Sequence, residues 1–298
     1  FSQLPYTRPD YQTVFQELDA LTRQVQDAPG AKEQAALYRQ AEELLSHVST
    51  QATLCSIRHT VDTRDAFYEA ENDYNDQQSP LLQEKLQAFQ KALLRSPFRK
   101  ELEQELGSLL FLNMELELKS FSPEIIPLMQ EENRLQNEYQ KLYASAQIPF
   151  QGKTVTVAQL GPYKESTDRA TRRAALEAEG SFFDENRQQF DELYDKLVKN
   201  RTEQARKLGY QNFVELGFLR QGRNCYAPED IAAFRDAVVK DLVPLTEKLK
   251  DRQARRLGIS DFKFHDNALK FKDGSAVPQG TPEEILAAGK KMYQELSP

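Results

Sequence analysis

Histidine, cysteine, glycine and tryptophan are scarce in this sequence of 298 residues. It contains no tryptophan, three histidines and two cysteines, and only two of its 12 glycines, Gly30 and Gly107, lie in the first 150 positions. Glycine is the residue that most readily adopts the positive φ angles of tight turns. So few glycines argue against a turn-rich β architecture, and we predict an all-α fold of long helices.

The two cysteines, Cys55 and Cys225, lie far apart, and neither has a partner at the spacing of a metal or redox motif. This excludes a disulfide framework and predicts a reducing, cytoplasmic location. No apolar run approaches the ~20 residues that cross a bilayer, so we expect no membrane partner. The start lacks a secretory signal and an initiator methionine, and we interpret the chain as a trimmed or excised piece.

Charge is unevenly distributed along the chain. Residues 1–150 carry 14 Lys and Arg against 23 Asp and Glu, whereas residues 151–298 carry 25 against 23, and the whole chain has a net charge of −7. Basic clusters occur at Arg169, Arg172 and Arg173 and again at residues 252–256, but carboxylates accompany both. We expect no nucleic-acid partner, because such proteins usually have a strongly basic domain.

Apolar residues recur at three- and four-residue steps through most of the first half, which predicts amphipathic helices. The pattern is interrupted at four prolines, each beside a glycine or a serine: Pro29-Gly30, Ser79-Pro80, Ser96-Pro97 and Ser122-Pro123. We therefore expect helices over residues 10–28, 31–74, 81–94, 98–118 and 124–143. In the last two pairs the serine suits an N-cap and the proline suits the first helical turn.

The pattern alternates with period two between residues 148 and 158, which predicts a small β-hairpin there. We take it as the boundary between an N-terminal helical region, 1–147, and a second region, 148–298, which begins a further helical lobe. Ser166 or Thr167 is expected to cap the longest helix, ending before Gly209. Other predictions are a short helix at 212–219, a helix from Pro228 towards Gly258 kinked near Pro244, a loop or second hairpin at 261–277, and a final helix from Thr281.

Catalytic motifs are absent from the sequence. His47, His59 and His265 are the only histidines, and no His-Glu-x-x-His or Glu-x-x-His occurs. Glu43 with His47, and His59 with Asp62, have helical spacing, but one such pair is usually an ordinary polar contact. The segment 152–154 resembles a phosphate-binding loop without its first glycine or its following helix. No catalytic, cofactor-binding or metal residue is therefore assigned.

Three stretches resemble the N-terminal part of oligoendopeptidase F, in the thimet oligopeptidase group of zinc metallopeptidases. They are IRHTVDTRDAFY at 57–68 followed by Glu71 and Pro80; the hairpin with STDR at 166–169 and RRA at 172–174; and YDKLVKNR at 194–201 with Ala205, Leu208, Gly209, Tyr210, Phe213, Arg223, Tyr226, Phe234 and Arg235. Their order along the chain matches the family, and residues 1–55 match least.

The resemblance implies an almost wholly helical, two-lobed enzyme with a deep channel that admits short peptides. Its zinc is bound by His-Glu-x-x-His and a later glutamate, which lie beyond this sequence. We therefore hypothesise that the chain is the channel-wall portion of a peptidase, without zinc or activity by itself, and that the missing C-terminal catalytic part is its partner. Arg220, Arg223 and Tyr226 are channel candidates by position only, and surface arginines and a packed tyrosine explain them equally well.

An alternative belongs to another class of protein. A free-standing helical binding or scaffold protein would have kept the same fold and lost catalysis. Under the first hypothesis, a lobe without its partner should expose apolar surface and self-associate.

Overall fold

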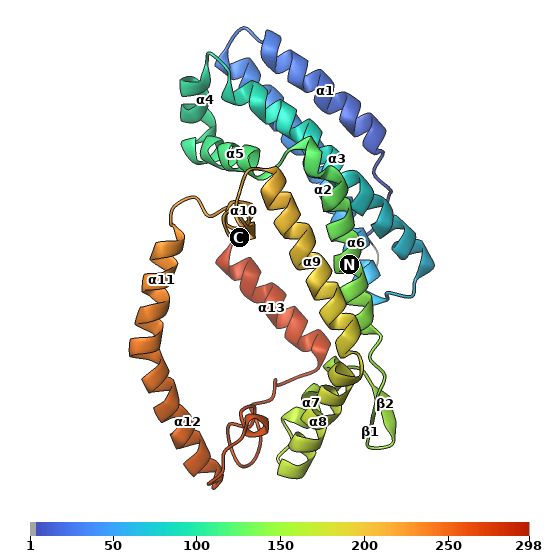
Figure 1. The fold of residues 1–298 in the computed structure, drawn as a ribbon, viewed down its shortest axis with the longest axis vertical. Helices are drawn as coiled ribbons and strands as arrows, with labels where there is room; N and C mark the ends of the chain where they lie inside the picture. The colour runs from blue at the N-terminus through green and yellow to red at the C-terminus, as the bar shows by residue number, and fades with distance from the viewer. Residues whose placement is uncertain (1–3, 298) are drawn as a thin grey trace. The chain divides into compact units, whose positions relative to one another are not determined.

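The computed structural model describes residues 4–297, and the regular secondary structure of this part of the chain is helical apart from one antiparallel hairpin (Figure 1). The predicted all-α fold with a small hairpin is confirmed. Contacts divide the chain into two compact units. Unit 1 contains the residues up to Ser145 together with Asn186–Ala232, and unit 2 contains Ala146–Glu185 together with the residues from Ala233 onward. The domain boundary between residues 147 and 148 stays a prediction.

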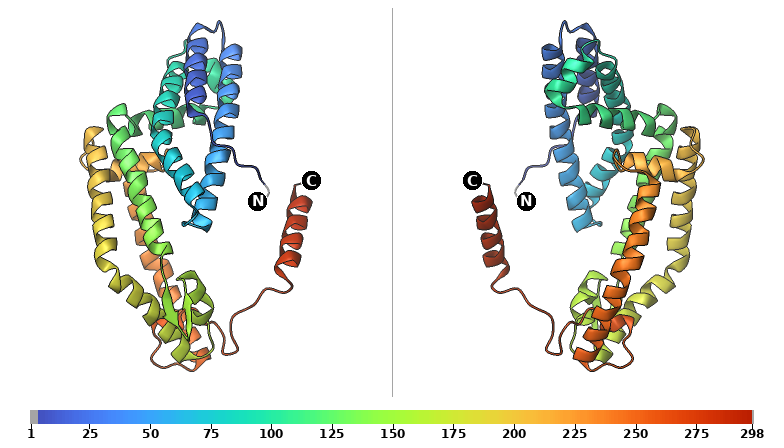
Figure 2. Two further views of the ribbon diagram at one scale, coloured as in Figure 1. Left: turned by 90° about the vertical axis from the view of Figure 1, so that its right-hand side faces the viewer. Right: turned by 90° about the vertical axis from the view of Figure 1, so that its left-hand side faces the viewer.

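Unit 1 is a set of packed helices. They are α1 (Tyr11–Asp27), α2 (Ala31–Val61), α3 (Ala66–Leu94), α4 (Arg99–Leu106), α5 (Ser108–Ser120), the 3₁₀ turn η1 (Pro123–Ile125), α6 (Ile126–Ala144), α9 (Arg187–Lys207) and α10 (Phe213–Arg220). Helices α1, α2 and α3 pack on one another, α3 also contacts α6, and α6 runs beside α9 (Figure 2). The longest helix is α2, not the helix predicted to end before Gly209.

The main core of unit 1 lies where the stripes of α1, α2 and α3 meet. Leu18 and Val25 on α1 are fully buried, as are Phe89 and Leu93 on α3. These positions recur with the helical period in the sequence. Each of the three helices therefore buries one apolar stripe in the same core. The apolar pattern was therefore sufficient to predict this part of the fold.

The prediction that Ser79-Pro80 ends a helix is wrong, because α3 continues through Pro80. A proline inside a helix leaves the carbonyl four residues earlier without its usual donor. Here the Asp76 carbonyl accepts a bond of 3.0 Å from Asn133 Nδ2, and the neighbouring Gln77 carbonyl accepts one of 2.8 Å from Gln130 Nε2. Side chains of α6 therefore supply the donors at this point of α3.

The helical run predicted over residues 31–74 is in fact two helices, and the break lies at Asp62. There φ is −139° and ψ is 96°, outside the helical region. The Asp65 carboxylate then caps α3 by accepting bonds from the backbone of Phe67 and Tyr68 at 2.9 and 3.2 Å. Aspartate favours such caps because its side chain satisfies donors that the first turn leaves free.

Two further expected helices are also divided. The stretch 98–118 splits at Gly107, whose φ of +92° a glycine adopts without strain. The stretch from Ser166 to Gly209 splits at Asn186, where ψ is 10°. Its N-terminal cap is Asp168 instead of Ser166 or Thr167, because the Asp168 carboxylate accepts bonds from the backbone and hydroxyl of Thr171.

Unit 2 has fewer long helices. It contains β1 (Ile148–Phe150), β2 (Lys153–Val155), η2 (Ala158–Leu160), α7 (Gly161–Lys164), α8 (Arg169–Glu185), the π-helical segment η3 (Val238–Leu242), α12 (Val243–Leu257), η4 (Phe264–Asp266) and α13 (Pro282–Leu296), and α11 (Pro228–Ala237) leads into it. In the hairpin Ile148 pairs with Val155, and both pack near Leu160. No described helix in residues 4–297 is both long and apolar enough to span a bilayer.

Where the kink near Pro244 was expected, the structure has the π-helical segment η3, just before the proline. A π-turn accommodates the lost backbone donor without ending the helix. The 261–277 segment is a loop containing η4, and no second hairpin occurs in the described residues. The final helix begins at the predicted place, and Thr281 and Glu284 form a capping box at its start.

The buried stripe of α1 yields the first prediction. Leu18→Ala should lower the free energy of unfolding of unit 1 by about 3 kcal/mol, because it removes buried apolar atoms and leaves a cavity. Leu109→Ala is the matched control, since Leu109 is 58% exposed, and should change stability little. Urea denaturation followed by far-UV circular dichroism measures both, and equal losses would contradict the assigned core.

Candidate functional site

The three histidines lie on separate elements and do not converge. His47 is exposed on α2, His59 is buried near the end of the same helix, and His265 lies in η4 of unit 2. Within residues 4–297, no group of three His, Cys, Asp or Glu side chains is arranged to hold a metal ion. Among these described residues, the histidines therefore do not form a zinc site with carboxylates or thiols.

His59 has a different partner from the one its sequence spacing suggested. Its Nε2 lies 2.7 Å from Glu69 on α3, and Lys141 of α6 pairs with the same carboxylate. Asp62 instead pairs with Arg64 in the turn between α2 and α3. His59 thus joins a polar contact among three helices.

The cysteines are both free thiols. Cys55 is buried on α2, and Cys225 is exposed in the loop after α10. Burial raises the pKa of the Cys55 thiol, which keeps it protonated and unreactive near neutral pH. Neither belongs to a nucleophilic arrangement.

A buried carboxylate, Glu132 on α6, is the centre of a polar cluster in unit 1. It accepts bonds from Arg201 Nε at 2.6 Å and from Gln204 Nε2 at 2.8 Å, both on α9. A third bond of 3.1 Å comes from Arg220 Nη1 at the end of α10. Burial alone would raise the pKa of Glu132, but these donors outweigh it and hold the pKa below its usual value.

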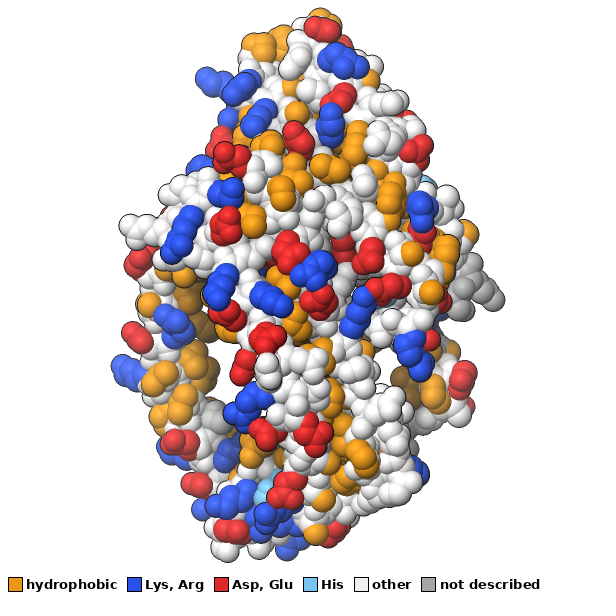
Figure 3. Space-filling model, turned by 45° about the vertical axis from the view of Figure 1, so that its right-hand side comes forward, with side chains coloured by type: hydrophobic (Ala, Val, Ile, Leu, Met, Phe, Trp, Pro, Cys, Tyr) orange, Lys and Arg blue, Asp and Glu red, His pale blue; other side chains and the backbone are white. Residues whose placement is uncertain are grey.

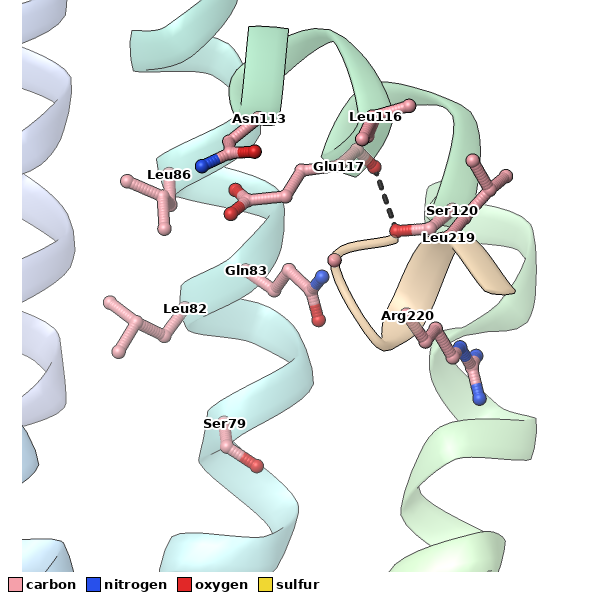
Figure 4. A pocket seen from close by; sticks show the side chains of 11 residues that line it. Ser79, Leu82, Gln83, Leu86, Asn113, Leu116, Glu117, Ser120, Leu219 and Arg220 are labelled. Carbon is pink, nitrogen blue, oxygen red and sulfur yellow. Dashed lines mark hydrogen bonds between the residues drawn. The ribbon is translucent and has the colours of Figure 1, made fainter. Parts of the chain in front are cut away.

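Arg220 also lines a cavity of unit 1, which has a volume of about 500 Å³ (Figure 4). Helix α3 contributes Ser79, Leu82, Gln83 and Leu86, helix α5 contributes Asn113, Leu116, Glu117 and Ser120, and the end of α10 contributes Leu219, Arg220 and Gly222. The Gln83 amide extends from α3 towards α10 in this view. A cavity of this size with a few polar groups is typical of small-ligand sites.

The other two channel candidates lie beside this cavity without lining it. Arg223 stacks over the ring of Phe218 at 4.3 Å and lies 5.8 Å from the ring of Tyr226. Tyr226 itself is 41% exposed. The structure therefore places Arg220 in a cavity and gives Arg223 and Tyr226 a packing contact with each other.

Unit 2 contains a buried ion pair of its own. Asp266 in η4 is fully buried and accepts a 2.7 Å bond from Arg172 Nη2 on α8, whose side chain is also buried. Arg169 of the same helix pairs with both Asp266 and the exposed Asp261. Burial alone would raise the pKa of Asp266, but bonds from Arg169, the Lys263 backbone and Arg172 hold the pKa well below its usual value.

The surface shows why the charge clusters of the sequence were poor guides to these sites. Positive and negative side chains alternate over the face drawn in Figure 3, and exposed pairs such as Arg173 with Glu177 contribute little. Sequence reasoning missed Glu132, Glu117 and Asp266, because acidic residues are common and their partners lie far along the chain. No local signal distinguishes them.

Comparison with known families assigns most of the chain. The model of the peptidase M3 N-terminal domain matches residues 1–121, and the model of peptidase family M3 matches residues 162–274. Among curated protein sequences, none matches significantly.

Three solved structures match the whole chain. A PZ peptidase A determined with an inhibitor is 44% identical with a TM-score of 0.95, and a protein described as oligoendopeptidase F is 42% identical with the same score. A protein from Bacillus anthracis that is also described as an oligoendopeptidase F is 38% identical with a TM-score of 0.93. This chain spans only 53% of the first two proteins and 55% of the third.

The Asp266 pair gives a pH-dependent prediction. Because the folded-state pKa is depressed, its stabilisation is present above the unfolded pKa of ~3.9 and is lost as pH falls through the lower folded value. Asp266→Asn should therefore lower the stability of unit 2 by about 3 kcal/mol at pH 7, and by progressively less below pH ~4.

The control for this prediction is Asp261→Asn, which removes only the exposed partner of Arg169. Thermal unfolding of the three proteins between pH 7 and pH 2.5 provides the measurement. A constant difference between Asp266→Asn and the parent at every pH would show that the carboxylate charge is not responsible.

Proposed function

Since this chain belongs to peptidase family M3, we propose that it is the N-terminal, channel-wall portion of a zinc-dependent oligoendopeptidase that hydrolyses short peptides. The observation that carries this proposal is the match of the whole chain to about half of each related structure. The zinc ligands and the glutamate that activates water would come from the other half. These 298 residues alone would then have no peptidase activity and bind no stoichiometric zinc.

Exposed apolar side chains in unit 2 support the same proposal. On α13 these include Leu286, Tyr293 and Leu296, each at least 70% exposed, and that helix has no buried residue. Leu245 and Leu249 on α12 are each 52% exposed. Their spacing would suit them to the interior of a larger helical lobe. The missing catalytic part is the partner that would cover them, and a cytoplasmic location would suit the two free thiols.

Complementation with the C-terminal half of a related peptidase tests this function. We expect the chain alone to leave a fluorogenic oligopeptide uncleaved. After co-expression with the remaining C-terminal part of PZ peptidase A, it should form a complex whose peptidase activity a chelator abolishes. The matched control pairs that C-terminal part with its own N-terminal half.

Two outcomes would contradict the proposal. Chelator-sensitive cleavage by the chain alone would disprove its inactivity. Failure to form a complex, while the control pair becomes active, would favour the scaffold alternative over the channel-wall role.

The exposed apolar residues also predict self-association of the isolated chain. Sedimentation velocity over a hundredfold concentration range should show a rising sedimentation coefficient. Replacing Leu286 and Leu296 by serine should reduce this rise, because both are exposed on α13. The control replaces Leu109, an exposed leucine of α5 in unit 1, and a strictly monomeric parent chain would refute the prediction.

A further inference from the structure

The loop over residues 261–277 of unit 2 is attached to α12 by hydrogen bonds that the helix donates. Gln253 Nε2 donates to the carbonyl oxygens of Asn267 and Leu269 at 3.1 and 2.6 Å. Arg256 Nε donates to the carbonyl oxygen of Lys270 at 2.8 Å. Because Gln253 and Arg256 are three positions apart, they lie on the same face of α12. These bonds fix the backbone of residues 267–270 against that face.

Two ammonium groups meet at Asn267. Lys250 Nζ on α12 donates to the side-chain Oδ1 of Asn267 at 2.6 Å, and Lys270 Nζ donates to the Asn267 carbonyl oxygen at 2.8 Å. Lys250 is half-buried and Lys270 is exposed, so solvent reaches the pair from the side of Lys270. We call the group formed by Lys250, Asn267 and Lys270 the Asn267 site.

No carboxylate neutralises these two charges in the part of the chain that the structure describes. Within residues 4–297, neither Lys250 nor Lys270 forms an ion pair. Asp266, the nearest acid in the loop sequence, is already bound by two arginines of α8. Helix α12 adds further positive charge, because it carries five lysines and arginines against two acidic residues. The Asn267 site therefore has an excess of two positive charges.

The two ammonium groups repel each other. Burial, followed by the positive charge of Lys270, lowers the pKa of Lys250. Attachment of the loop does not require this repulsion, since the neutral amide of Gln253 binds the same loop without a charge. An ordinary contact between a lysine and a loop oxygen explains either bond alone, but not two like charges brought to one residue. An anion bound to both ammonium groups would remove the repulsion.

The donors that remain favour a phosphoryl group as this anion. An ammonium group has three N–H donors. Lys270 uses one on Asn267, whereas Lys250 uses one there and directs another to Gln253 at 3.5 Å. A phosphate monoester carries a charge of about −1.5 to −2 at pH 7 and has three strong acceptor oxygens, so it neutralises both lysines where a carboxylate neutralises one. Arg256, bound to the Lys270 carbonyl, adds a third positive charge beside the site.

We propose that the Asn267 site binds the phosphoryl group of free phosphate or of a small phosphate monoester. Lys250 and Lys270 each donate to a different phosphoryl oxygen, and the remainder of an ester extends into solvent on the side of Lys270. The proposal rests on contacts within unit 2, and it holds whether or not the chain is the wall of a peptidase channel.

Calorimetric titration of the 298-residue chain with inorganic phosphate, in a phosphate-free buffer of low ionic strength, tests this site. We expect one phosphate to bind per chain with a dissociation constant of about 1 mM or lower. Acetate at the same ionic strength should bind about tenfold more weakly, because it neutralises only one of the two lysines. Equal affinity for acetate, or no saturable binding of phosphate or phenyl phosphate at about tenfold that concentration, would overturn the proposal.

Phenyl phosphate distinguishes the two sources of the phosphoryl group. Tighter binding of phenyl phosphate than of inorganic phosphate would identify an ester as the ligand. Equal or weaker binding of phenyl phosphate would identify free phosphate.

Lysine variants with matched changes of charge locate the site. Lys250→Gln and Lys270→Gln should each weaken phosphate binding about tenfold, because glutamine keeps an N–H donor for Asn267 but loses the charge. Lys248→Gln removes the same charge at an exposed position of α12 that does not bond to Asn267 in the described structure, and should weaken binding less than about twofold. Circular dichroism confirms that each variant is folded. Equal effects of Lys248→Gln and Lys250→Gln would show that the general charge of α12 attracts phosphate, and would refute the Asn267 site.

Discussion

The carboxylate of Glu132 lies among three helices of unit 1 and accepts bonds from two of them. It belongs to α6, its donors Arg201 and Gln204 belong to α9, and Arg220 ends α10. A buried charge without partners is strongly destabilising, so the positions of α9 and α10 follow from the need to satisfy this group. The cavity beside α10 depends on the same contact, because Arg220 forms part of its wall.

Unit 2 also contains a buried carboxylate bound by arginines, but the order along the chain is reversed. There the arginines lie close together on α8, and the buried acid, Asp266, comes from a loop more than ninety positions later. The loop leaves most of its apolar side chains exposed, among them Phe264 and Phe271, and Leu269 is its only buried apolar residue. Gln253 of α12 adds a 2.6 Å bond to the Leu269 carbonyl. Polar contacts thus order a segment that hydrophobic burial alone would leave weakly fixed.

Residues close to each helix start predicted most of these starts. The errors arise where the deciding contact comes from a residue far away in the sequence. Ser122 caps a helix as expected, and the helices expected at Asn212 and Thr281 begin there with those side chains as caps, because a cap depends on residues within one turn. The cap expected at Ser96 is wrong, because α4 begins later and its N-cap is Phe98. The helix end predicted at Pro80 is wrong because the donor for the carbonyl of Asp76 comes from Asn133 on another helix. Glu132 could not be distinguished from 45 other acidic residues, since its partners are about seventy positions away. The family resemblance, in contrast, was visible from ordered motifs and is now confirmed.

The interleaved order of the two units bears on how the chain matures on the ribosome. Helix α6 emerges early, but α9 and α10 follow only after the whole of Ala146–Glu185, which belongs to unit 2. Until then Glu132 has none of its three donors, and the nascent α6 presents an unsatisfied acid where the finished unit has a buried one. Unit 1 therefore cannot complete its folding in a simple N-to-C sequence. Its last polar contacts form only after the inserted segment has left the exit tunnel.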